Sequence, residues 1–474
     1  MRVVKDSVES VSRLHKKDYR DYEFIVAEIQ RFQSLSPQQQ WEHWKAHPWD
    51  AMGGIKTPSG GTIYLTRDAR TRLHQVTERG LRAMGPAAER HNAEKVYEEL
   101  PRQFINLVVE GADITEENAH RVFEGAIQNL EGLFVEQTHY VPCAVVMHRV
   151  RDMFTIGPVT FILRERFFRE NEQAIREAAE RWSPVMSPDI LSRTQSFYTD
   201  FMWIARITVP PCDISISRER ARAGIQKALD VFKLIVGSGR AANVKMAHEI
   251  ALPQRPWELT STQGKGFAIR SSGGSHDAIV NDEWYEQVTA FPEWPLFQGA
   301  LSEYWSQWGD LNDLLARFID ALSWHSDAIS ERDLSARIIK FWTAVERLLS
   351  VAAKGNLAAR LAVLSADTVE GFESCVRKLS ILYQRRSEIV HGSAHRSRES
   401  WYRHAAAGAE EASKTALIQF LRAVPGIRCR YRASDRKSLE GWLAWLDDIA
   451  RGYRAGIGGP KENAATDAEA DKEP

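Results

Sequence analysis

The chain has 474 residues, of which 43% are hydrophobic and 26% are charged, and its formal net charge is -1. This length exceeds one ordinary hydrophobic core and predicts about two to four domains. The composition is typical of a globular protein. Because the net charge is close to zero, a uniformly basic surface is excluded, and any nucleic-acid-binding surface has to be local.

The cysteines and the apolar segments indicate a reducing, non-membrane environment. The chain begins with a charged segment that has no apolar signal region, and no apolar run approaches the ~20 residues of a membrane span. The cysteines lie far apart and form no CxxC pair, which disfavours disulfides and a cysteine-based zinc site; they are Cys143, Cys212, Cys375 and Cys429. We therefore expect a cytoplasmic protein without a metal, another cofactor or a membrane partner.

Residues 1–130 are predicted to form a mainly helical segment. Apolar residues recur three and four positions apart in residues 22–34 and 95–109, and Pro101 is expected to break the second helix. Residues 52–65 are rich in glycine and predict a loop that leads into a short strand.

Two histidines in this first segment are a weak metal signal. His43 and His47 are four residues apart, but the surrounding sequence EHWKAH is not the HExxH motif of zinc enzymes. A role at the surface is favoured over a metal site.

Residues 131–300 are predicted to be an α+β region. Two β-branched runs flank a charged turn in residues 138–163 and predict a hairpin. Residues 202–209 predict another strand, which the following pair of prolines is expected to end. A helix over residues 217–237 follows, and its final glycine closes it.

From about residue 308 to 424 the pattern is helical throughout, and a last helix follows near residues 435–452, so residues 301–454 are predicted to form a helical domain. Gly355 and Gly392 are expected to cap helices, and residues 455–474, with almost no large apolar side chain, are expected to be disordered. The expected fold class is therefore α+β, with a mixed N-terminal region that contains a small sheet, followed by an all-α helical bundle. The predicted helices are 309–326, 331–353, 356–364, 369–391, 399–423 and 435–452.

One arginine of the bundle is predicted to lie on an apolar helical face. The apolar stripe of residues 369–391 runs from Phe372 to Val390, and at ~100° per residue Arg386 projects from its middle. Such a charge needs an anionic partner or a ligand phosphate, because an isolated buried charge loses its hydration. Glu346, at the edge of the apolar face of a preceding helix, is a candidate partner that would aim Arg386.

A histidine ends the same helix. His391 precedes Gly392 and follows Arg386 by five positions, which turns a regular helix by ~500°, so that the two side chains point ~140° apart. A two-fold axis beside the helix end would bring two arginines and two histidines together. We therefore expect a composite site in a homodimer formed through the helical domain.

These residues carry a family resemblance. The segment YQRRSEIVHG, residues 383–392, contains Arg386 and His391 separated by four residues, with Ser387 after the arginine. It resembles the R-x4-6-H signature of HEPN superfamily ribonucleases, and RSEIVHG is similar to the ApeA-like group. The stretches RIIKFWTAVERLLS, residues 337–350, and GNLAARLAVL, residues 355–364, resemble the preceding helices of that group. The resemblance covers roughly a third of the chain, and residues 1–300 carry no family motif that we identify.

The resemblance implies a metal-independent endoribonuclease. In this chemistry the ribose 2′-OH attacks its own phosphodiester and the 5′-oxygen leaves. The residue types suit it, because a histidine exchanges protons near neutral pH and a guanidinium binds two phosphate oxygens. The implied catalytic residues are Arg386 and His391, with Glu346 in support. The resembled group includes anti-phage proteins, which implies a role in antiviral defence or as a toxin.

Basic and polar residues around the helix end form a candidate RNA-binding surface. The alternative is a solvated positive face without a ligand. The candidate RNA-binding residues are Arg385, Ser387, His395, Arg396, Arg398, Arg428, Arg430 and Arg432.

A structural interpretation stays open for each catalytic candidate. An arginine on an apolar stripe is often paired, a histidine before a capping glycine often contacts exposed carbonyls, and Glu346 can pair with Arg337 or Arg347 instead. The chain would then be a non-catalytic HEPN protein that dimerises, binds nucleotide or recognises a partner through residues 1–300. On the nuclease interpretation, residues 131–300 select the substrate or sense a phage-derived or cellular trigger.

Overall fold

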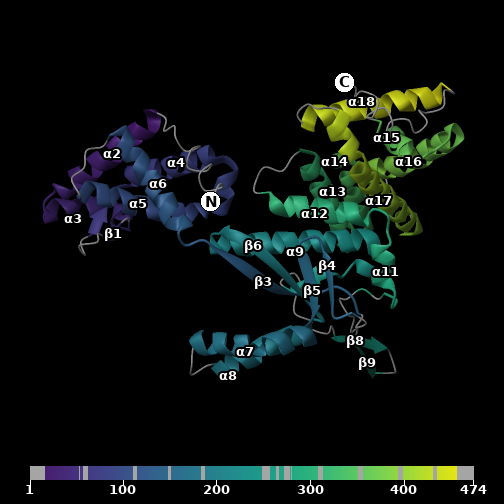
Figure 1. Ribbon diagram of the computed structural model, residues 1–474, viewed down its shortest axis with the longest axis horizontal. Helices are drawn as coiled ribbons and strands as arrows, with labels where there is room; N and C mark the ends of the chain where they lie inside the picture. Colours follow the sequence, from purple (N-terminus) through teal and green to yellow (C-terminus); the bar gives the residue numbers. More distant parts are fainter. Residues whose placement is uncertain are drawn as a thin grey trace, which may run out of the picture. The chain divides into compact units, whose positions relative to one another are not determined.

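The computed structural model describes residues 16–52, 54–56, 62–109, 115–147, 151–182, 187–247, 257–262, 266–271, 278, 280–307, 313–350, 356–392, 399–430 and 435–455. The fold class is α+β, as predicted, with many helices and a small central sheet (Figure 1). The chain divides into two compact units. The first comprises residues 1–139, 208–221 and 307–310, and the second comprises residues 140–207, 222–306 and 311–474.

The first unit is built mainly from helices, with one short antiparallel hairpin in its glycine-rich segment. Its N-terminal elements are α2 (Lys16–Gln33), α3 (Pro37–Ala46), η1 (Pro48–Met52), β1 (Gly54–Lys56), β2 (Thr62–Tyr64), α4 (Arg67–Met84), η2 (Gly85–Arg90), α5 (Ala93–Val109) and α6 (Glu116–Glu131).

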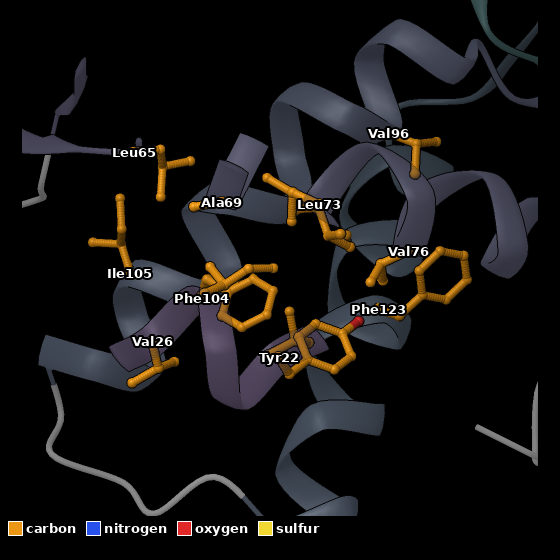
Figure 2. Close-up of a cluster of buried hydrophobic side chains, with 14 of the residues drawn as sticks. Tyr22, Val26, Leu65, Ala69, Leu73, Val76, Val96, Phe104, Ile105 and Phe123 are labelled. Carbon is orange, nitrogen blue, oxygen red and sulfur yellow. The ribbon is translucent and has the colours of Figure 1, made fainter. Parts of the chain in front are cut away.

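The core of this unit is apolar and aromatic (Figure 2). The rings of Tyr22 and Phe104 lie 4.6 Å apart, with Leu73 buried in the same cluster. The predicted break of α5 at Pro101 is wrong, since the helix continues through it. A proline inside a helix costs about 3 kcal/mol, whereas burial of a large apolar side chain contributes about 1.5–3 kcal/mol. Leu100 and Phe104, both fully buried, therefore offset the proline.

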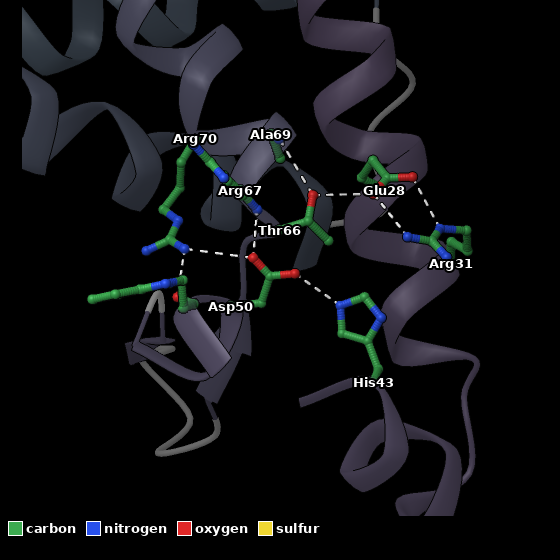
Figure 3. Close-up of polar contacts among 9 residues, drawn as sticks. Glu28, Arg31, His43, Asp50, Thr66, Arg67, Ala69 and Arg70 are labelled. Atoms are coloured by element: carbon green, nitrogen blue, oxygen red, sulfur yellow. Dashed lines mark hydrogen bonds and ion pairs between the residues drawn. The ribbon is translucent and has the colours of Figure 1, made fainter. Parts of the chain in front are cut away.

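A buried carboxylate anchors the segment between α3 and α4 (Figure 3). Asp50 Oδ2 lies 2.8 Å from His43 Nε2, and Asp50 Oδ1 accepts a 2.7 Å hydrogen bond from the Arg67 backbone N–H. Arg70 adds an ion pair at 3.5 Å. The expectation of a surface role holds for His47, which is exposed, but not for His43, which is half-buried and ties α3 to the following turn.

The central sheet differs from the predicted hairpin. Its strands are ordered β4-β5-β6-β3-β7, and the hairpin is formed by β4 and β5, with Ile156 paired to Val159 and Gly157 at a φ of 56° in the turn. The sequence prediction joined the first strand of residues 138–163 to the second, but β3 pairs with β7 and neighbours β6. The strands are β3 (Val135–Ala144), β4 (Met153–Ile156), β5 (Val159–Leu163), β6 (Trp203–Cys212) and β7 (Lys245–Met246).

The predicted end of β6 is also too early. The strand includes Pro210 and Pro211 and runs to Cys212. The register of β5 against β6 covers Trp203 to Arg206 only, so on the β5 side the prolines interrupt no ladder hydrogen bond.

Helices accompany the sheet on both faces, with α9 along one and α7 and α8 along the other (Figure 1). Gly237 has a φ of 85° and closes α9, as predicted. A separate hairpin and two helices lead to the bundle. These elements are α7 (Arg164–Trp182), α8 (Ser187–Thr199), α9 (Ile214–Val236), α10 (Ser238–Ala241), β8 (Trp257–Thr262), β9 (Gly266–Ser271), α11 (Trp284–Thr289) and α12 (Trp294–Ser306).

The C-terminal bundle contains every helix predicted for it, within a few residues at most ends. The largest difference is in α17, which continues past residue 423 and through Pro425 to Arg430. The helix α14 packs mainly against α13 and α17. The helices are α13 (Asp313–Ser330), α14 (Leu334–Leu349), α15 (Leu357–Val363), α16 (Val369–Val390), α17 (Glu399–Arg430) and α18 (Asp435–Arg454).

Some sequence predictions fall on residues that the structure does not describe. They are the cap at Gly355 and nearly all of the C-terminal segment, residues 456–474. Among the described helices, none combines the length and the apolar character that a membrane span requires.

Candidate active site

The candidate site is carried by the C-terminal half of α16. The helix begins at Thr368, whose hydroxyl accepts the Gly371 backbone N–H at 3.1 Å. It ends at His391, whose backbone N–H still donates to Ser387 O at 2.9 Å, and Gly392 follows with a φ of 73°. A positive φ favours glycine, so the sequence places the end of this helix and fixes where His391 sits.

Arg386 faces the bundle, as the apolar stripe predicts. The same face of α16 buries Phe372, Leu379 and Leu382. The Arg386 side chain is 24% exposed, and its Nη2 atom lies 3.3 Å from Oε1 and 3.4 Å from Oε2 of Glu346, which α14 supplies. Of the arginines that the sequence offered as partners of Glu346, Arg386 is therefore one that contacts it. A single guanidinium nitrogen contacts both carboxylate oxygens, and these distances are longer than those of an arginine–carboxylate pair with two parallel hydrogen bonds.

The competing partners of Glu346 have other contacts. Arg337 donates to the backbone oxygen of Glu331, and Arg347 forms an ion pair with Asp320. Both lie on α14 with Glu346 but point to other parts of the bundle. Glu346 thus does not pair with Arg337 or Arg347, the alternative that the sequence left open.

Tyr383 completes the polar cluster and was not singled out by sequence reasoning. Its hydroxyl donates a 2.9 Å hydrogen bond to Glu346 Oε1, and its ring packs edge-on against Trp342, with centroids 5.1 Å apart. Burial, together with the hydrogen bond to Glu346 and its negative charge, raises the pKa of Tyr383. The phenol therefore stays a donor at neutral pH. The available signal was its position three residues before Arg386, on the same helical face.

Arg386 keeps an unused donor. Its Nε atom is shut off from water and has no hydrogen-bond partner among the described residues. A buried donor without a partner is costly, by about 1–3 kcal/mol, and charged groups are costlier still. The Arg386 side chain as a whole is 24% exposed, so part of it remains accessible to an anionic ligand. The cluster of Glu346, Tyr383 and Arg386 can thus hold a guanidinium in place beside solvent.

His391 lies at the exposed end of α16. Among the described residues no side-chain contact joins it to Arg386, which is turned inward against α14. This agrees with the ~140° between the two positions on a regular helix. One copy of the chain therefore presents the two groups on different sides of the helix end.

The candidate RNA-binding residues divide into two groups. Ser387 and Arg385 are half-buried on α16, and the Arg385 guanidinium lies over the ring of Trp401, with Cζ 5.4 Å from the centroid. The others lie outside the described residues or have only their backbone described, as Arg428 and Arg430 do at the end of α17. The undescribed residues are His395, Arg396, Arg398 and Arg432.

No candidate metal centre is found in the described part of the chain, where no three or more His, Cys, Asp or Glu side chains are placed to hold an ion. Comparison of the chain with known proteins gives no match to a family model, a curated protein or a solved structure. The geometry of the site is therefore the basis for its interpretation.

Proposed function

We propose that this protein is a metal-independent endoribonuclease of the HEPN type, with Arg386 and His391 as its catalytic residues. The observation that carries the proposal is the half-buried Arg386, held by Glu346 and Tyr383, with its Nε donor unpartnered. A phosphate-binding arginine has to keep some of its donors for the ligand, and Arg386 uses a single guanidinium nitrogen for Glu346.

The proposed reaction needs a phosphate clamp and two proton transfers. The O2′–P bond forms, the P–O5′ bond breaks, one group takes the 2′-OH proton and another gives a proton to the leaving 5′-oxygen. Arg386 would bind the non-bridging oxygens and stabilise their developing charge. An imidazole such as that of His391 serves both as base and, once protonated, as acid. The products carry a 2′,3′-cyclic phosphate and a 5′-hydroxyl.

The separation of Arg386 and His391 on one helix supports a composite site in a homodimer. Two copies related by a two-fold axis near Gly392 would bring the His391 of one copy to the Arg386 of the other, so that each working pair draws on both copies. A mixture of the inactive Arg386→Ala and His391→Ala proteins, exchanged into mixed dimers, should then regain part of the activity. Each variant alone is the control, and an active monomer at working concentration would contradict the composite site.

The direct test uses purified full-length protein and total RNA, with and without EDTA, beside a His391→Ala control. Cleavage should be insensitive to EDTA and absent from the control, and the products should have cyclic phosphate ends. Products with 5′-phosphate ends, or loss of activity in EDTA, would point to metal-assisted hydrolysis. Nucleotide binding that depends on Arg386 without any cleavage would support the alternative, a non-catalytic HEPN protein.

We also propose a role for the N-terminal residues. Residues 1–300 contain folded elements outside the nuclease site, and the first unit has its own core, with Tyr22, Leu73 and Phe104 fully buried. A region of this kind suits the recognition of RNA or of a phage-derived or cellular trigger. The trigger would activate the nuclease only by binding its active and inactive arrangements unequally. A function in antiviral defence or as a toxin in the cytoplasm follows from the family resemblance and from this proposal.

A further inference from the structure

Both consecutive arginines of α16 lie over aromatic rings, but among the described residues only Arg386 also has a carboxylate partner, Glu346. Arg385, adjacent to Arg386, lies with its guanidinium over the indole of Trp401, with Cζ 5.4 Å from the ring centroid. Its Nη1 atom is shut off from water and has no hydrogen-bond partner among the described residues. Two consecutive arginines thus each have a buried nitrogen without a partner among the described residues, at positions that are ~100° apart on the helix.

Among the residues that the structure describes, Arg385 has no carboxylate partner of the kind that other helical arginines have. Arg403 on α17 pairs with Glu399 at 2.7 Å, and Arg176 on α7 pairs with Glu172 at 3.0 Å. The glutamate nearest to Arg385 in sequence, Glu388, instead accepts a 3.2 Å hydrogen bond from Gln384. In the described residues, the contact that orients Arg385 is therefore an aromatic face.

The packing of two helices places Trp401 there. At Gly408 the helices approach so closely that an added Cβ would lie 2.7 Å from Leu382 Cδ2. This contact brings the first turn of α17 beside the last turns of α16. Trp401 remains half-buried, and its ring meets that of Tyr402 edge-on at 4.8 Å. Part of Trp401 is therefore left accessible.

We infer that Trp401 and Arg385 form a subsite for an unpaired nucleobase of RNA, next to the phosphate that Arg386 binds. This inference rests on the proposed ribonuclease function. An indole stacks on a base of any sequence, and a guanidinium adds a planar cation with a two-pronged set of donors for base edges or phosphate. A base in a duplex is stacked on its neighbours and is not available to Trp401. The subsite therefore selects single-stranded RNA.

The test measures binding apart from cleavage. A short fluorescein-labelled single-stranded RNA is titrated with full-length His391→Ala protein and followed by fluorescence anisotropy. In this background Trp401→Leu should weaken binding by about 5- to 150-fold, which corresponds to the about 1–3 kcal/mol of a base–aromatic stack. Trp401→Phe should keep most of the affinity. The same RNA annealed to its complement should bind more weakly and without dependence on Trp401.

Arg385 gives a second, independent readout. Arg385→Lys keeps the charge but loses the planar stack, so it should weaken binding while leaving the salt dependence of the affinity unchanged. Arg403→Gln, an exposed arginine on α17, is the matched control and should bind like the parent. In the active enzyme, Trp401→Leu should raise KM with little change in kcat.

The outcomes separate this inference from the proposed function. Folded Trp401→Leu and Arg385→Lys proteins that both bind RNA within twofold of the parent would overturn the subsite, even if the wild-type enzyme cleaves RNA. Binding that depends on Trp401 in a protein that cleaves no RNA would support the subsite and overturn the nuclease. A protein that neither binds nor cleaves single-stranded RNA would overturn both.

Discussion

Two arginines of the same bundle, one buried and one half-buried, differ in how many hydrogen bonds their guanidinium groups donate. Arg360 on α15 is 8% exposed, donates to both carboxylate oxygens of Asp447 at 2.8 and 2.6 Å, and donates to Leu349 O at 2.6 Å. Arg386 is 24% exposed and reaches Glu346 through one nitrogen at 3.3 Å, and its Nε has no partner among the described residues. Arg360 therefore has the contacts of a structural residue, whereas the hydrogen bonds of Arg386 are incomplete.

The largest expected effect is on catalysis at Arg386 and His391. Loss of a positioned proton-transfer group lowers rates by about 10²- to 10⁴-fold, and loss of a group that stabilises the transition-state charge lowers them by about 10²- to 10³-fold. Arg386→Ala and His391→Ala should each show such a loss in initial rates of RNA cleavage. Arg377→Ala, an exposed change on the same helix, is the control. Wild-type rates in either site variant would contradict the assignment.

Arg360 and Arg386 should differ clearly in how much their substitution lowers the free energy of unfolding. Arg360→Ala should cost about 3 kcal/mol, near the low end for breaking a buried pair, because Asp447 is 35% exposed. Arg386→Ala should cost under about 1 kcal/mol, since its ion pair is partly solvated. Urea unfolding of both variants measures the difference. If Arg386→Ala is as destabilising as Arg360→Ala, Arg386 is a structural residue.

A buried histidine of the bundle should make its stability depend on pH. His325 is fully buried, with Nδ1 2.9 Å from Ser413 Oγ, and burial lowers its pKa from 6.5 to about 3. As the pH falls below 6.5 the unfolded chain binds a proton that the folded chain does not, so stability is lost between pH 6.5 and about 3. The slope from this group is about 1.4 kcal/mol per pH unit.

The measurement compares the free energy of unfolding at pH 6.5 and 4.5 in the parent protein and in His325→Gln. Carboxylates contribute to both proteins, so the difference between the two slopes isolates His325. Equal slopes would show that His325 is not buried as a neutral group.

The smallest expected effect concerns the hydroxyl that holds Glu346. Tyr383→Phe removes the 2.9 Å hydrogen bond to Glu346 but keeps the ring against Trp342. A hydrogen bond contributes about 0.5–1.5 kcal/mol, so kcat should fall by about tenfold or less, with KM and the melting temperature nearly unchanged. Tyr383 is a positioning residue on this view. An unchanged kcat would show that Glu346 and Arg386 keep their positions without the hydroxyl of Tyr383.

Sequence reasoning predicted the bundle more accurately than the sheet. Helical periodicity is local, so α14 and α16 begin and end within a few residues of their predicted bounds. Strand pairing is not local. The runs in residues 138–163 have the composition of a hairpin, yet β3 lies between β6 and β7, which come much later in the chain. The prediction at Pro101 failed for the same kind of reason. The burial of Leu100 and Phe104 in the tertiary structure outweighs the local tendency of a proline to end a helix.

The sequence by itself determined that Arg386 lies on the core-facing side of a helix and that His391 ends this helix before Gly392. Both follow from the 3.6-residue turn and from the backbone freedom of glycine. Only the tertiary structure decided that Glu346 contacts Arg386 and not Arg337 or Arg347, that Tyr383 holds Glu346, and that Trp401 covers Arg385. The choice of partner depends on which helices pack together, and this is fixed by the shapes of side chains far apart in the sequence.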